Sequence, residues 1–186
     1  MDRIAQYHLP GLFEFYELYR MFLPLFREHR EYFYDWCEIG SIYGAPSDCI
    51  WGGGRTGFGE NDPKEVLDLM QEYGISARLT FSNSLLTPEH LSDRMCNRLC
   101  ALFSTPGPVE NGVIVSSDLL LAHLARQYPE LYFVSSTTKV LTDFTDLHCK
   151  NHIFMMCLDC FLAIMQRQNH LCTSAIEENS VTGDHF

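Results

Sequence analysis

The sequence is short of positive charge. It contains 13 Lys and Arg residues against 24 Asp and Glu residues, which gives a formal net charge of −11 at pH 7. Binding to a nucleic-acid backbone depends on clustered cationic side chains, so this deficit argues against a nucleic-acid partner.

Long apolar runs are also missing. No stretch of eighteen uncharged apolar residues occurs, so no membrane-spanning helix is predicted. The first residues, Met1 to Ile4, lack the cationic and then apolar layout of a signal peptide. These absences predict a cytoplasmic protein of bacterial type with no membrane partner.

Cysteine is the one residue type that is unusually common for such a protein. The eight cysteines are scattered along the chain, as at Cys37, Cys49, Cys96 and Cys100. Disulfides are rare in the cytosol, so free thiols or a metal site are favoured over disulfides. The length of 186 residues and the 46% content of hydrophobic residues predict one globular domain with a real core.

The first part of the chain has the pattern of an amphipathic helix. Apolar residues recur at helical spacing in the 12–31 segment, at Leu12, Phe15, Tyr16, Tyr19, Phe22 and Leu23. Pro24 removes one backbone donor, so we expect a kink or a break there. Residues 1–35 are therefore predicted to form an N-terminal helical segment.

The period changes after residue 36. Short β-branched or aromatic runs bounded by turn residues predict strands at 38–43, 77–82, 112–116 and 131–135. Helices are expected between them at 63–73, 87–103 and 118–127. Strands that alternate with helices form parallel sheets with right-handed crossovers.

The spacing of these strands predicts a partial (β/α) barrel. The mean distance between strand starts is (131 − 38)/3 = 31 residues, and a complete barrel of eight such units needs about 250 residues. The chain therefore holds four to five parallel strands, in a βα-repeat region at 36–147. Their inward faces are expected to draw on apolar residues of these runs, among them Ile39, Leu79, Phe81, Ile114, Val115, Phe133 and Val134.

The remaining residues, 148–186, form a divergent tail that contains Cys and His. Residues 153–158 are a candidate fifth strand, and the polar stretch 173–186 is expected to be frayed. Four residues of the tail have side chains suited to a metal, but buried thiols are the favoured interpretation and no cofactor is predicted for this chain. They are Cys157, Cys160, His170 and Cys172.

Polar side chains follow each predicted strand. In parallel α/β folds, ligands bind at the carboxyl ends of the strands, so these residues are candidates for binding a polar or anionic substrate. The candidates are Arg55, Asn83, Ser116, Ser136, Thr137 and Lys139. The alternative is that Ser, Thr and Asn here only cap helices and make turns. Arg55 lies in a glycine-rich loop at 52–59, which is either an anion-binding loop or a structural turn.

Four segments carry a resemblance to a known group. They are WCEIGSIYGAP at 36–46, CIWGGGR at 49–55, RLTFSN at 78–83 and FVSSTTK at 133–139. In this order and spacing the chain resembles, over residues 9–146, a family of uncharacterised Firmicutes proteins with a TIM-barrel-like fold, distantly related to the U32 peptidases. The resemblance implies a barrel followed by a Cys-rich region that holds an iron–sulfur cluster in several relatives.

No matching Cys-rich motif follows Lys139 in this sequence. The chain is therefore expected to be a truncated relative that binds a small substrate, with catalysis dependent on the missing Fe–S region. The alternative is a non-catalytic assembly module, because the open sheet edge of a partial barrel invites pairing with a second copy.

Overall fold

The computed structural model describes residues 5–53, 61–136 and 138–139. One five-stranded sheet organises this part of the chain. Its strands are β1 (Ala5–Pro10), β2 (Cys37–Gly44), β3 (Ser76–Phe81), β4 (Gly112–Val115) and β5 (Tyr132–Ser135). The α-helices are α1 (Tyr16–Glu28), α2 (Pro63–Glu72), α3 (Arg94–Phe103) and α4 (Asp118–Gln127). Short 3-10 helices lie at η1 (Arg30–Tyr32), η2 (Ile50–Gly52) and η3 (Pro88–Ser92).

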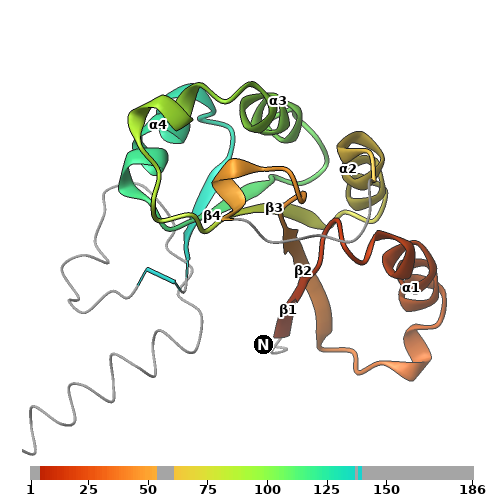
Figure 1. Ribbon diagram of the computed structural model, residues 1–186. Helices are drawn as coiled ribbons and strands as arrows, with labels where there is room; N and C mark the ends of the chain where they lie inside the picture. Colours follow the sequence, from red (N-terminus) through yellow and green to blue (C-terminus); the bar gives the residue numbers. More distant parts are fainter. Residues whose placement is uncertain (1–4, 54–60, 137, 140–186) are drawn as a thin grey trace, which may run out of the picture.

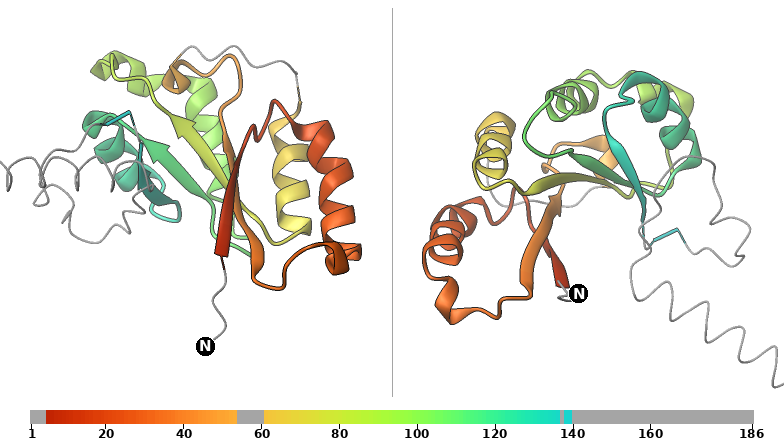
Figure 2. Two further views of the ribbon diagram at one scale, coloured as in Figure 1. Left: turned by 90° about the horizontal axis from the view of Figure 1, so that it is seen from below. Right: turned by 180° about the vertical axis from the view of Figure 1, so that it is seen from behind.

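The strands lie side by side in chain order, and every neighbouring pair is parallel. The sheet curls into a half-barrel, and the four α-helices cover its outer face (Figures 1 and 2). This arrangement confirms the predicted parallel α/β class and the half-barrel. No helix of the described residues is long and apolar enough to cross a membrane.

The strand β1 is the element that the sequence did not predict. It pairs with β2 over six residues and belongs to the segment that was expected to be only helical. The first βα unit of the sheet is therefore β1 followed by α1. Helix α1 also continues through Pro24, so of the expected kink or break the break is wrong. Its buried side chains, Tyr16, Tyr19 and Leu23, hold the helix against the core along the turns that precede the proline.

The other predicted elements lie close to their expected positions. The predicted helix at 87–103 is divided into η3 and α3. The division occurs at Asp93, whose carboxylate accepts a hydrogen bond of 2.8 Å from the backbone N–H of Cys96 and so caps a new helix. The candidate strand at 153–158 and the polar stretch at 173–186 lie outside the described residues.

Most of the apolar residues in the strands pack beneath the helices. Leu79, Phe81, Val115 and Phe133 belong to one core cluster with the buried residues of α3 and α4. Among the apolar residues that were candidates for the inward face, Ile114 lies opposite Thr80 of β3, and Val134 lies opposite Ile114, so these two share the face of Thr80. Some of the listed residues therefore lie on the inner face, as expected, and the others pack beneath the helices.

The inner face carries a buried polar network. Arg78 is 6% exposed, and its Nε donates a hydrogen bond of 2.6 Å to the hydroxyl of Tyr132. That hydroxyl lies 2.6 Å from Ser76 Oγ, which in turn donates to the carbonyl of Glu110 at 2.7 Å. Arg78 can only donate, so the Tyr132 hydroxyl accepts from it, and because the Ser76 proton goes to the Glu110 carbonyl, the Tyr132 hydroxyl donates to Ser76. The chain of hydrogen bonds ties β3 to β5 across Gly112 of β4.

Candidate functional site

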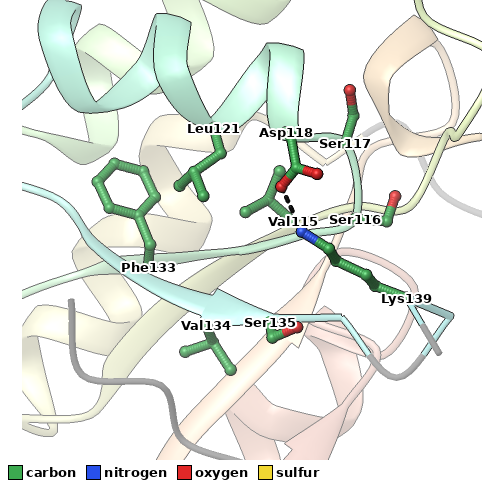
Figure 3. Close-up of a pocket in the computed structure, with 9 residues that line it drawn as sticks. All are labelled: Val115, Ser116, Ser117, Asp118, Leu121, Phe133, Val134, Ser135 and Lys139. Carbon is green, nitrogen blue, oxygen red and sulfur yellow. Dashed lines mark hydrogen bonds and ion pairs between the residues drawn. The ribbon is translucent and has the colours of Figure 1, made fainter. Parts of the chain in front are cut away.

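A cleft lies at the carboxyl edge of the sheet, between the ends of β4 and β5 and the first turn of α4 (Figure 3). Its base is apolar and its rim is polar. The lining residues are Val115, Ser116, Ser117, Asp118, Leu121, Phe133, Val134, Ser135 and Lys139.

Backbone hydrogen bonds hold the two strand ends that form the cleft. The N–H of Ser116 donates to the carbonyl of Phe81 at 3.2 Å, and the N–H of Ser136 donates to the carbonyl of Val115 at 2.9 Å. Ser117 then caps α4, since its hydroxyl accepts a hydrogen bond of 3.3 Å from the N–H of Leu120. The polar rim is therefore placed by the sheet and by the helix start together.

The turn after β5 brings Lys139 back across the cleft. The N–H of Lys139 donates to the carbonyl of Ser136 at 3.0 Å, and the hydroxyls of Ser136 and Thr138 lie 2.8 Å apart. The Lys139 ammonium forms an ion pair with Asp118 in the first turn of α4 (Figure 3). The lysine side chain is 25% exposed and the aspartate side chain 78% exposed. The cation is thus the more buried partner, and the carboxylate stands at the solvent side.

The cleft also contains an unsatisfied hydroxyl. Ser135 Oγ is buried and has no hydrogen-bond partner in the part of the chain that the structure describes. The cavity has a volume of about 10 Å³, which is close to the roughly 10–15 Å³ that one water needs and far below a typical small-molecule pocket. In this conformation the cleft can receive one polar group and not a whole molecule.

The structure brings four of the predicted site residues to one edge of the sheet. Ser116 and Lys139 line the cleft. Ser136 is buried beside it and holds the turn that carries Lys139. Asn83 instead anchors η2 and its own loop, donating from Nδ2 to the carbonyl of Ile50 at 2.9 Å and accepting at Oδ1 from the N–H of Leu85 at 2.9 Å. Both polar groups of Asn83 thus have backbone partners.

The remaining predicted residues, Arg55 and Thr137, lie outside the described residues. Ser135 and Asp118 line the cleft although they were not among the predicted site residues. Asp118 stands at a predicted helix start, a position where a carboxylate is common for structural reasons alone. The sequence signal that would have singled it out is its position directly after the strand-end serines.

The described residues offer no ligand set for a metal ion. No group of three or more His, Cys, Asp or Glu residues among them is placed to hold one. The cysteines described by the structure, Cys37, Cys49, Cys96 and Cys100, are free thiols. The weaker metal candidates Cys157, Cys160, His170 and Cys172 lie outside the described residues.

Comparisons of the chain with protein-family models, curated proteins and solved structures found no match. The fold defines the chain as a parallel α/β half-barrel that resembles part of a TIM barrel. The resemblance to the U32-like family stays a prediction.

Proposed function

We propose that this half-barrel binds the anionic or polar end of a small molecule at the cleft between β4 and β5. Lys139 recognises the negative charge, and the hydroxyls of Ser116 and Ser135 contact the oxygen that enters the cleft. One observation carries the proposal: the Lys139 ammonium stands at the cleft together with the buried Ser135 hydroxyl, which has no partner among the described residues.

The proposed ligand inserts a single oxygen atom, because the cavity of about 10 Å³ has room for little more. A carboxylate or phosphate oxygen suits this position. It can accept a hydrogen bond from the Ser135 hydroxyl while a second oxygen of the same group pairs with the Lys139 ammonium. The rest of the ligand then lies outside, along the carboxyl edge of the sheet.

Asp118 competes with the proposed ligand for the Lys139 ammonium. Its carboxylate already pairs with Lys139, but it is largely exposed to solvent. Because the Asp118 carboxylate stays largely in solvent, its pairing with Lys139 should contribute only about 1 kcal/mol, and an external anion can displace it at low cost. Removing the charge of Lys139 should therefore lower the ligand affinity, and removing the charge of Asp118 should raise it.

Isothermal titration with acetate and inorganic phosphate tests the proposal, with acetamide as a neutral control that has the same shape as acetate. Lys139→Met should weaken anion binding at least about tenfold, because a charge-assisted hydrogen bond is worth roughly 1.5–3 kcal/mol. Asp118→Asn should strengthen it by up to about fivefold, the equivalent of about 1 kcal/mol. Acetamide should bind more weakly than acetate to the unmodified protein.

Lys64→Met is the control for net charge, since it removes one lysine that forms an ion pair with Asp68 on α2, away from the cleft. This variant should bind both anions as the unmodified protein does. Equal losses in Lys64→Met and Lys139→Met would mean that only net charge matters. Weaker binding in Asp118→Asn would contradict displacement of the carboxylate.

A second candidate function is assembly with another copy of the chain. Within the described residues, β1 pairs only with β2 and β5 pairs only with β4, so each has one unpaired edge. Two copies that join β5 of one to β1 of the other would close both edges. Light scattering after size-exclusion chromatography separates the candidates: a concentration-independent monomer mass contradicts assembly and leaves the binding proposal intact.

A further inference from the structure

Two buried cysteines from distant parts of the chain meet outside the cleft. Cys49 precedes η2 in the loop after β2, and Cys96 lies in the first turn of α3. Their Sγ atoms are 2.9 Å apart, although the residues are 47 positions apart in the sequence. Cys49 is 2% exposed and Cys96 is 0% exposed. The sequence alone favours free thiols that pack as small apolar groups.

The distance between the two sulfurs is too short for simple packing. Carbon atoms in contact lie about 3.5–4.0 Å apart, and sulfur is larger than carbon. The Sγ separation of 2.9 Å needs to shorten by only about 0.9 Å to reach the bond length of a disulfide. A third cysteine, Cys100, lies one turn further along α3 and is equally buried. It provides an internal comparison for a thiol that packs in the core.

The surroundings make the two thiols chemically different. The hydrogen bond from Cys96 lowers the pKa of the Cys49 thiol, and backbone hydrogen bonds from Trp51 and Gly52 act in the same direction against the effect of burial. The same hydrogen bond and burial raise the pKa of Cys96. Burial also raises the pKa of Cys100. Cys49 is therefore the better nucleophile of the three, since the thiolate is the reactive form.

We propose that Cys49 and Cys96 are a redox-active pair that a small hydroperoxide such as hydrogen peroxide oxidises to a disulfide. The Cys49 thiolate attacks one peroxide oxygen, the O–O bond breaks, and the leaving hydroxide takes up a proton to become water. The Cys96 sulfur then attacks the sulfenic acid on Cys49, the S–O bond breaks, and the hydroxide leaves as water with the Cys96 proton. Two thiols and one peroxide thus give one disulfide and two waters.

The new bond would join the loop after β2 to α3. Trp51 lies two residues from Cys49, is fully buried, and donates from its indole N–H to the carbonyl of His90 at 2.8 Å. A disulfide formed at Cys49 should therefore change the fluorescence of Trp51. The other tryptophan, Trp36, is 42% exposed. Trp36→Phe removes its signal and makes Trp51 the sole reporter.

The test treats the fully reduced, folded chain with hydrogen peroxide, blocks the remaining thiols with iodoacetamide and maps the peptides by mass spectrometry. Cleavage after Arg and before Asp places Cys37, Cys49, Cys96 and Cys100 on separate peptides, because Asp48, Arg94 and Arg98 lie between them. Among the four cysteines that the structure describes, we expect one cross-linked pair, Cys49 with Cys96, that dithiothreitol reverses. The same treatment should change the fluorescence of the Trp36→Phe protein.

Single substitutions test the order of events. Cys96→Ala should leave Cys49 as a sulfenic acid that dimedone captures, whereas Cys49→Ala should leave Cys96 unmodified at the same peroxide concentration. Cys100→Ala is the control for a buried thiol on α3 and should still form the cross-link. Circular dichroism verifies that each variant is folded, and the peptide map of the unmodified chain decides the question if one is not.

Three results would overturn the proposal. The first is that Cys49 and Cys96 both remain alkylatable only after denaturation, with no cross-link at any peroxide concentration. The second is a cross-link that involves Cys100 or Cys37 in place of this pair. The third is dimedone capture at Cys96 and not at Cys49 in the single variants.

Discussion

The hydroxyl of Tyr132 is the central group of the inner-face network, and its removal should destabilise the sheet by about 2–4 kcal/mol. Tyr132→Phe keeps the ring but removes the acceptor for Arg78 Nε and the partner of Ser76 Oγ, both at 2.6 Å. A hydrogen bond to a charged group contributes about 1.5–3 kcal/mol and a neutral one about 0.5–1.5 kcal/mol. The expected loss is a large part of the roughly 5–15 kcal/mol of a typical domain.

Gly112 provides a second, independent perturbation of the same ring. A Cβ atom at this position would lie 2.5 Å from Cε2 and 2.6 Å from Cζ of Tyr132. Because the Tyr132 hydroxyl is hydrogen-bonded to both Arg78 and Ser76, the ring cannot move away without breaking these hydrogen bonds. Gly112→Ala should therefore cost about 1–3 kcal/mol through overpacking. In a Tyr132→Val background the clash is absent, and the same substitution should be nearly neutral.

Urea unfolding followed by circular dichroism gives the unfolding free energy of the unmodified protein, Gly112→Ala, Tyr132→Val and the double variant. Tyr132→Phe is measured in the same way, with Tyr7→Phe as its control for an exposed tyrosine of the same sheet. A clash between the residue 112 side chain and the Tyr132 ring predicts a coupling energy above about 0.5 kcal/mol between positions 112 and 132. Equal costs for Gly112→Ala with and without the Tyr132 ring would refute the clash, and a Tyr132→Phe variant as stable as the control would refute the role of the hydroxyl.

Three further perturbations have defined directions. Burial lowers the pKa values of His8 and His123 from 6.5, so the unfolded chain binds more protons than the folded chain as the pH falls below 6.5. The unfolding free energy should therefore fall on acidification from pH 7 to pH 5. The fall should be less steep after both histidines are replaced by Gln. The oxidised Cys49–Cys96 form, with a 47-residue separation, should be about 4 kcal/mol more stable than the reduced form in calorimetry. Asp62→Ala removes the cap that accepts from the N–H of Lys64 at 2.9 Å and should lower the unfolding free energy by about 1 kcal/mol in urea.

The sheet could be predicted where the strands are buried and bounded by turn residues. Strands β2 to β5 combine β-branched or aromatic residues with flanking Gly, Ser or Pro, and they lie close to their expected positions. Strand β1 has only Tyr7 with a strong strand preference, ends at Pro10 and lies at the edge of the sheet. Strand β1 forms through its pairing with β2, and the local sequence pattern does not indicate this pairing.

The site could be predicted only as far as topology determines it. Parallel strands end at one edge, and this rule alone placed Ser116 and Lys139 together. The ion pair between Lys139 and Asp118 depends on the path of the turn after β5. The contact between Cys49 and Cys96 joins residues from two units of the fold. Such pairs arise from the assembled tertiary structure, so composition and spacing could not identify them.

Nitrogen-15 NMR spectra recorded during an acetate titration test the central claim most directly, because they locate the bound anion residue by residue. Binding of the anion at the cleft predicts that the largest amide shifts occur at Ser116, Ser117, Ser135 and Lys139, and that Lys139→Met abolishes them. Shifts that concentrate at the start of α2, or that persist unchanged in Lys139→Met, would contradict it.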